Sequence, residues 1–211
     1  MRTINLLIKR IFDIISSLTM IIILIVIPIL IVIPIIIKLT SKGPAFFKQE
    51  RVGKNKKPYI MYKFRTMIVE RYDREGNEIM SEDRITKIGK FLRKTSLDEL
   101  PQLFNVLNGS MSIIGPRPML VYQAPRCVGE ENLRFEMRPG ITGLAQAKGR
   151  NNLSWPERIQ YDIEYVKSFN LLLDIKIVFE TVLTVIKHDG TEVKAEYRGV
   201  DRFSKHYNPG D

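Results

Sequence analysis

Two adjacent carboxylates, Asp98 and Glu99, stand at the head of the apolar stretch LDELPQLFNVLNG. Ser96 and Glu99 have the spacing of a helix capping box, and acids in a helix's first turn gain about 0.3–1 kcal/mol from its macrodipole. Capping alone explains most acidic pairs of this kind. The chemical interpretation is that an ionised carboxylate binds Mg²⁺ or attacks an electrophilic phosphorus. We expect the helix N-terminus, Arg93 and Lys94 to keep Asp98 ionised.

Arginines in separate loops favour the chemical interpretation. Arg117 lies in GPRP, and the glycine-rich stretch RPGITGLAQAKGR begins with Arg138 and ends with Arg150. Planar guanidinium groups match phosphate oxygens, and proline and glycine give such loops a defined shape. A nucleophile, a metal and cationic clamps are what phosphoryl transfer requires. Each loop is also compatible with an ordinary turn.

The composition favours an anionic partner. The chain has 211 residues, 45% of them hydrophobic, and a formal net charge of +10. This length is enough for one domain and an appendage. The positive net charge points to acidic lipid headgroups or a phosphorylated substrate as the partner. Nucleic acid is a weaker candidate, because the basic residues gather beside the apolar N-terminal segment. The one cysteine, Cys127, excludes an intramolecular disulfide, and the two histidines are too isolated for a zinc site.

Residues 18–37, LTMIIILIVIPILIVIPIII, carry no charge. At about 1.5 Å per residue this length matches a hydrocarbon core of about 30 Å, and no small-residue cleavage site follows it. Pro28 and Pro34 each remove a backbone donor and favour a kink or break. Since basic residues flank both ends, a bent helix that enters and leaves by the cytosolic face satisfies both flanks. A single spanning helix is the alternative.

A hairpin is predicted over residues 46–67, with its turn at Gly53–Pro58. Its second strand alternates apolar and basic side chains at the strand period of two, with Lys63 and Arg65 on the basic side. That basic edge faces either solvent or phosphates, and the spacing does not decide between them.

Helices dominate the rest of the chain. Residues 85–94 predict a helix with an apolar stripe and a basic border, and residues 97–107 predict a second, short helix. A capping box at 154–157 begins another helix, and residues 171–187 predict an amphipathic one that packs on the domain or lies on the bilayer. The fold class is therefore α+β, predominantly helical, with a small antiparallel hairpin and interfacial amphipathic helices.

Four blocks in order give the chain a close resemblance to the bacterial sugar transferases, the monotopic phosphoglycosyl transferases. They are KRIFD, FKQERVGKNKKPYIMYKFRTM, TSLDELPQLFNVLNGSMSIIGPRP and RPGITGLAQAKGRN. The likeness runs from about Lys9 to Lys187 and is greatest to the minimal catalytic form. We therefore divide the chain into a membrane-inserted helix (1–40), a catalytic domain at the cytosolic face of a bacterial cytoplasmic membrane (41–190) and a polar tail (191–211).

The resemblance implies transfer of a sugar 1-phosphate from a UDP-sugar to polyprenol (undecaprenyl) phosphate, with release of UMP, as the first membrane step of glycoconjugate assembly. Asp98 matches the nucleophile, which forms a covalent phosphosugar intermediate and contacts Mg²⁺. Glu99 matches its acid/base or orienting partner. The substrate-binding candidates are Lys63, Arg65, Arg93, Arg117, Arg138 and Arg150. The oligomeric state is open, with a homodimer as one candidate.

The resemblance also implies that the N-terminal helix is re-entrant and breaks near a proline that is usually preceded by serine. The matching residue is Pro28, and here Ile27 precedes it. Serine at that place supplies a hydroxyl that can satisfy backbone groups freed at the break, which isoleucine lacks.

Two other classes of protein remain open. A membrane-anchored glycosyltransferase that moves only the sugar releases UDP and needs no carboxylate nucleophile beside a metal. A non-catalytic membrane scaffold uses its basic face to recruit acidic partners. For the scaffold, Asp98→Asn matters no more than the loss of any surface acid.

Overall fold

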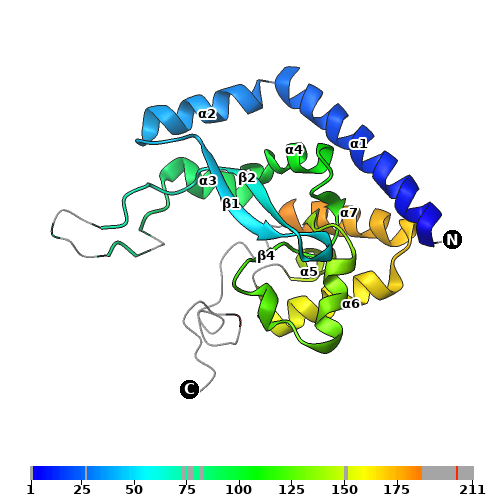
Figure 1. Cartoon of the computed structure of the whole chain (residues 1–211). Coiled ribbons are helices and arrows are strands. Elements are labelled where there is room, and N and C mark those ends of the chain that lie inside the picture. The colour runs from blue at the N-terminus through cyan, green and yellow to red at the C-terminus, as the bar shows by residue number, and fades with distance from the viewer. Residues whose placement is uncertain are drawn as a thin grey trace.

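The structure is a computed structural model that describes residues 2–26, 28–72, 75, 78–80, 83–149, 152–186 and 203. The α-helices in this part of the chain are α1 (Arg2–Val26), α2 (Ile29–Thr40), α3 (Lys87–Thr95), α4 (Gln102–Leu107), α5 (Leu144–Lys148), α6 (Trp155–Ser168) and α7 (Leu171–Ile186). The strands are β1 (Phe46–Val52), β2 (Pro58–Phe64), β3 (Ser112–Ile114), β4 (Met119–Leu120) and β5 (Gly140–Thr142). The predicted mixture of helix and strand, with helix predominant, is confirmed (Figure 1).

The N-terminal apolar segment is a bent pair of helices. The axis of α2 is bent by 60° from that of α1, and the pair forms an arch along one side of the molecule (Figure 1). Pro28 lies at the break, and its carbonyl accepts hydrogen bonds from the first turn of α2, at 3.1 Å and 2.7 Å. Pro34 lies inside α2, which continues through it, so Pro34 is not part of the break. Within the described residues no single helix is long and apolar enough to cross a bilayer. The two helices of the bent pair have that length and apolar character only when they are taken together.

The KRIFD block ties α1 to the rest of the domain. Lys9 and Asp13 are buried on α1. Lys9 Nζ donates to Asp174 Oδ2 of α7 at 2.7 Å. The Asp13 carboxylate accepts the Ser112 hydroxyl at 2.7 Å and the Ile113 amide at 3.0 Å, both in β3. Since buried charges are stable only when they are paired or hydrogen-bonded, these contacts fix the face that α1 turns inward.

The predicted hairpin is confirmed, with its turn between β1 and β2. The two strands pair antiparallel from Phe46 opposite Phe64 to Val52 opposite Pro58. β4 joins the other edge of β1, so the sheet order is β2-β1-β4. β3 and β5 form a separate parallel pair. The hairpin lies under the arch of α1 and α2 and forms the platform for the loops that follow (Figure 1).

The single helix predicted over residues 97–107 is wrong. Ser96 adopts a left-handed conformation (φ 59°) and its amide bonds the Arg93 carbonyl, so it ends α3 and does not cap a following helix. A 3₁₀ turn, Leu97–Glu99, comes next, and α4 starts only after Pro101. Proline has no amide hydrogen to continue a helix and is suited to a helix start, which explains the division.

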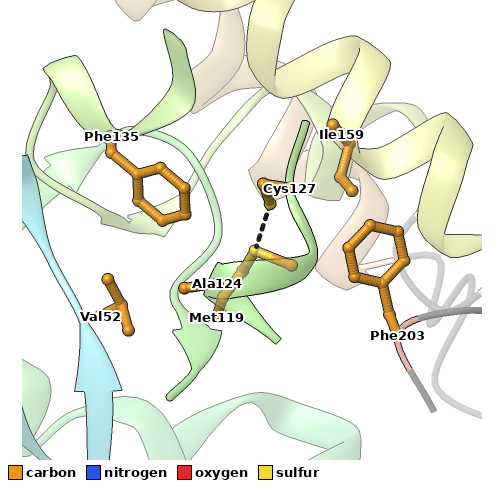
Figure 2. Packing of buried hydrophobic residues seen from close by; sticks show 7 residues of the cluster. All are labelled: Val52, Met119, Ala124, Cys127, Phe135, Ile159 and Phe203. Atoms are coloured by element: carbon orange, nitrogen blue, oxygen red, sulfur yellow. Dashed lines mark hydrogen bonds between the residues drawn. The ribbon is translucent and has the colours of Figure 1, made fainter. Parts of the chain in front are cut away.

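The capping box over residues 154–157 is confirmed. Ser154 N donates to Glu157 Oε2 at 2.7 Å, and Glu157 N donates to Ser154 Oγ at 3.4 Å. α6 therefore starts where the sequence predicts. It packs into a core that also takes a residue from the C-terminal tail, Phe203, which is fully buried. Figure 2 shows Phe203 and Ile159 facing Cys127 and Met119 in this core.

Both amphipathic helices pack on the domain and still expose apolar side chains. α7 buries Ile177 against β3 and β5. Its outer face leaves several large side chains exposed: Leu172, Ile175, Phe179, Val182 and Leu183. In α3, Leu92 is buried whereas Phe91 is exposed. The expectation that residues 171–187 pack on the domain is confirmed, and the alternative that this helix lies on the bilayer stays a prediction.

Candidate active site

The acid pair occupies the 3₁₀ turn between α3 and α4, beneath β2. Asp98 has only 9% of its surface exposed. Lys63 Nζ of β2 lies 2.5 Å from Glu99 Oε1 and 3.9 Å from Asp98 Oδ2, so one ammonium group bridges both carboxylates. The basic edge of the hairpin therefore turns Lys63 toward the acids and not to solvent.

Asn105 of α4 holds this arrangement together. Its side-chain amide donates to the Ile60 carbonyl at 2.7 Å and accepts from the Tyr62 amide at 3.0 Å, both in β2. Asn105 is almost completely buried. Because these bonds replace the ladder bonds that β2 lacks on this edge, they dock α4 on the strand and fix Lys63 above the turn.

Arginines stand at each end of the acid pair. Arg117 Nη2 lies 3.7 Å from Glu99 Oε1. At the other end, the charge of Arg93 acts on Asp98, and Arg93 Nε donates to Thr66 Oγ1 at 2.9 Å. α3 can approach that loop because Gly89 has no side chain: a Cβ there would lie 2.0 Å from the Thr66 carbonyl oxygen.

Other predicted site residues lie elsewhere. Arg65 is buried and donates to the Ser41 and Lys42 carbonyls, after the end of α2. Arg138 Nε donates to the Gly109 carbonyl at 2.8 Å, after the end of α4. Arg150 lies outside the described residues. Of the basic candidates, the structure thus brings Lys63, Arg93 and Arg117 to the acids, and it gives Arg65 and Arg138 other partners.

Burial dominates the electrostatics of Asp98. It raises the pKa of this carboxyl from 3.8 to about 6, an effect that Lys63 opposes and Glu99 reinforces, while Arg93 and Arg117 lower the pKa less strongly. Among the described elements, no α-helix N-terminus acts on Asp98, because the residue sits in a buried 3₁₀ turn ahead of α4, but the expectation that the carboxyl stays ionised holds. At pH 7 most of the carboxyl groups are still ionised.

A buried ion pair supports the loop that carries Arg117. Arg134 and Asp162 are each 1% exposed and pair through their side chains. Asp162 Oδ1 accepts the Arg117 amide at 3.3 Å, and Arg134 Nη2 donates to the Arg117 carbonyl at 2.7 Å. The backbone of Arg117 is thus held on both sides. Sequence reasoning missed this pair, because nothing local relates two residues 28 positions apart.

Arg51 was also missed as a site residue. This β1 side chain donates through Nη1 to the Pro118 carbonyl at 3.3 Å, next to Arg117. Burial and the nearby Arg117 charge lower its pKa to about 10. The period of two alone does not identify it. The cross-strand register does, because Arg51 pairs with Tyr59, which lies four residues before Lys63 and therefore on the same face.

The acid pair fits a magnesium ion that is shared with a substrate. Within the described residues no three acidic, histidine or cysteine side chains gather as a protein-only site. Mg²⁺ usually binds one or two carboxylates together with substrate phosphates, which two adjacent acids can provide. Glu99 is held by Lys63 at 2.5 Å, whereas Asp98 lies 3.9 Å from the same ammonium. Asp98 therefore has the more available oxygens.

Comparison with known proteins gives consistent matches. Residues 4–188 match the family model described as bacterial sugar transferase. The chain is 42% identical over 203 residues to the uncharacterized sugar transferase EpsL of Bacillus subtilis strain 168, which covers 94% of this chain and 96% of that protein. It is 45% identical over 188 residues to the UDP-glucose:undecaprenyl-phosphate glucose-1-phosphate transferase of Klebsiella pneumoniae. That match covers 85% of this chain but only 40% of the Klebsiella protein.

Proposed function

Because the chain belongs to the bacterial sugar transferase family, we propose that it moves a sugar 1-phosphate from a UDP-sugar to polyprenol phosphate and releases UMP. The observation that carries this proposal is the buried Asp98, set beside Glu99 and within reach of three cations. Relatives named as undecaprenyl-phosphate glucose-1-phosphate and galactose phosphotransferases support the same substrate classes. The product begins the assembly of a bacterial glycoconjugate at the membrane.

In the first half-reaction, an Asp98 carboxylate oxygen attacks the sugar-bearing phosphorus of the UDP-sugar. The bond between that phosphorus and the bridging oxygen breaks, and UMP leaves with the electron pair. Lys63 and Arg117 hold Glu99, and with Arg93 they supply positive charge where negative charge accumulates. The product is an aspartyl phosphosugar.

In the second half-reaction, a phosphate oxygen of polyprenol phosphate attacks the same phosphorus. The bond to Asp98 breaks and the carboxylate is regenerated, so the polyprenol carries a diphosphosugar. When the acceptor phosphate arrives with a proton, Glu99 accepts that proton. Once Glu99 is neutral, the Lys63 ammonium group, 2.5 Å from Glu99 Oε1, still balances the negative charge of the phosphates.

Mg²⁺ completes the site in this proposal. Asp98 would hold it together with oxygens of the diphosphate, and the ion would neutralise charge on the substrate phosphates. Excess EDTA is therefore expected to stop UMP release, and Mg²⁺ added beyond the chelator to restore it. Full activity in excess EDTA would contradict the metal requirement and leave the transfer itself standing.

The nucleotide product tests the reaction class. Purified protein in detergent with Mg²⁺, undecaprenyl phosphate and a panel of UDP-sugars is expected to release UMP, because the phosphorus attacked is the one that carries the sugar. Chromatography of the nucleotides distinguishes UMP from UDP. UDP as the product would favour a glycosyltransferase, and no nucleotide from any sugar would favour the scaffold.

The bent pair α1–α2 supports a re-entrant attachment at the cytosolic face of the cytoplasmic membrane. A chain bent by 60° at Pro28 can return to the side from which it entered, and basic residues lie at both ends of the pair. The exposed apolar face of α7 suits the interface of the same leaflet. Cysteines introduced at residues 2 and 42 are then labelled from the same side in sealed vesicles. Labelling from opposite sides would refute this topology.

A further inference from the structure

Two polar side chains beside the proposed site have no role in the mechanism above. Arg51 and Tyr59 face each other across β1 and β2. Tyr59, Met61 and Lys63 lie on one face of β2, because side chains of a strand alternate between its two faces. Arg51 lies opposite Tyr59, so it shares the face that carries Lys63 over the acids. The face therefore continues from Lys63 toward the loop of Arg117.

The Arg51 guanidinium is held in a fixed orientation. Its Nη2 donates to Gln49 Oε1 at 2.6 Å and its Nη1 to the Pro118 carbonyl at 3.3 Å. A guanidinium has five N–H donors, so these two bonds leave others free to bind a ligand. Within the described residues Arg51 Nε and the Tyr59 hydroxyl are buried without a hydrogen-bond partner. Such orphaned groups are uncommon, and a missing ligand or water is one recognised cause.

Positive charge exceeds negative charge here. Arg51 lies close enough to Arg117 for that like charge to lower its pKa, after the larger effect of burial. Glu99 is the acid that acts on both arginines. Four cations thus surround two carboxylates, and the full set is Lys63, Arg93, Arg117 and Arg51 around Asp98 and Glu99. An anion placed between Arg51 and Arg117 would relieve their repulsion.

We propose that Arg51 and Arg117 together bind the phosphate of the departing UMP, with Tyr59 supporting Arg51 from the opposite strand. The inference rests on the proposed function. In-line attack by Asp98 puts the leaving phosphate on the far side of the reacting phosphorus, and the cations run from Asp98 past Glu99 to Arg117 and Arg51. As the bridging bond breaks, the electron pair goes to an oxygen of that phosphate. The two guanidinium groups stabilise the charge as it develops.

The test separates the half-reactions. Enzyme mixed with Mg²⁺ and UDP-sugar, without acceptor, should give a burst of UMP, and UMP should inhibit it as a product. For Arg51→Met we expect a burst slower by about 10²-fold and UMP inhibition weaker by at least about tenfold. Transfer from preformed intermediate to acceptor should change by less than about threefold, since UMP has already left. Arg51→Lys should recover part of the loss, because it keeps the charge without the planar fork.

Arg158→Met is the matched control, since Arg158 is a partly buried arginine of α6 that stacks on Trp155, 5.4 Å from its ring centre, and has none of the contacts described for the proposed site. Melting temperature checks the fold of each variant, and if Arg51→Met does not fold, Arg51→Lys and Tyr59→Phe carry the same comparison. Unchanged burst and UMP inhibition in a folded Arg51 variant would overturn the inference, as would equal losses in both half-reactions. A wild-type enzyme that gives no UMP burst would instead overturn the proposed function, and the inference would fall with it.

Discussion

Asp98→Asn is expected to abolish UMP release, with a loss of about 10³-fold or more, because an amide is a poor nucleophile and cannot form the acyl phosphate. The variant keeps the shape of the side chain, so we expect the neighbouring side chains of Lys63 and Arg93 to keep their positions. Burst experiments with radiolabelled UDP-sugar measure both UMP and protein-bound label, and both should disappear. Retained label on the protein would show that another residue is the nucleophile.

Protonation gives this prediction a second signature. Since burial raises the pKa of Asp98 to about 6, the wild-type rate should fall as the pH drops below about 6, as the attacking carboxylate becomes protonated. The effect on stability has the opposite sign. A raised pKa means that the folded protein binds this proton more readily than the unfolded chain, so the stabilising contribution is present at low pH and is lost as the pH rises from about 4 to about 6. At pH 7 Asp98→Asn should therefore melt no lower than wild type.

Asp162→Ala is expected to lower the free energy of unfolding by about 3–5 kcal/mol, because it leaves the Arg134 charge buried without its partner. Both side chains are only 1% exposed, so water cannot replace the lost contact. The Arg117 amide also loses its acceptor. We therefore expect UMP release to decline even at temperatures where the variant is folded. Thermal and denaturant unfolding in detergent measure the first effect, and the nucleotide assay measures the second.

The double variant Asp162→Leu with Arg134→Met controls for the loss of the pair itself. Replacing both charges by apolar side chains of similar size removes the uncompensated charge, so most of the stability should return. Activity should return less, because the Arg117 carbonyl and amide still lack their partners. If Asp162→Ala unfolds within about 1 kcal/mol of wild type, the pair is not the support described above.

Local patterns predicted the elements whose determinants are local. The hairpin follows from alternation bounded by glycine and proline, and the start of α6 follows from the Ser154–Glu157 box. The helix predicted over 97–107 failed because Ser96 ends α3 in a left-handed conformation and α4 begins only after Pro101. The spacing of the apolar residues does not mark either boundary.

Which basic residues lie beside the acid pair was predictable only in part. Of the candidates that the resemblance gives, Lys63, Arg93 and Arg117 lie beside the acids. Arg65 is two residues beyond Lys63, but β2 ends at Phe64, so the alternation no longer determines where that side chain points. Arg51 could be found only once the cross-strand register was known.

The inward contacts of α1 mean that the N-terminal helix and the part of the chain that carries the acid pair form one folding unit. Besides the Lys9 and Asp13 contacts, Arg10 donates to the Val106 and Leu107 carbonyls at the end of α4, at 2.6 Å and 3.0 Å. α4 is the helix that follows the acid pair, so these contacts of α1 stabilise the helix next to the site. Cutting the chain after residue 40 is therefore expected to destabilise α4 and the turn that carries the acid pair. A variant designed for solubility would change the exposed outer face of α1 and keep its polar inner face.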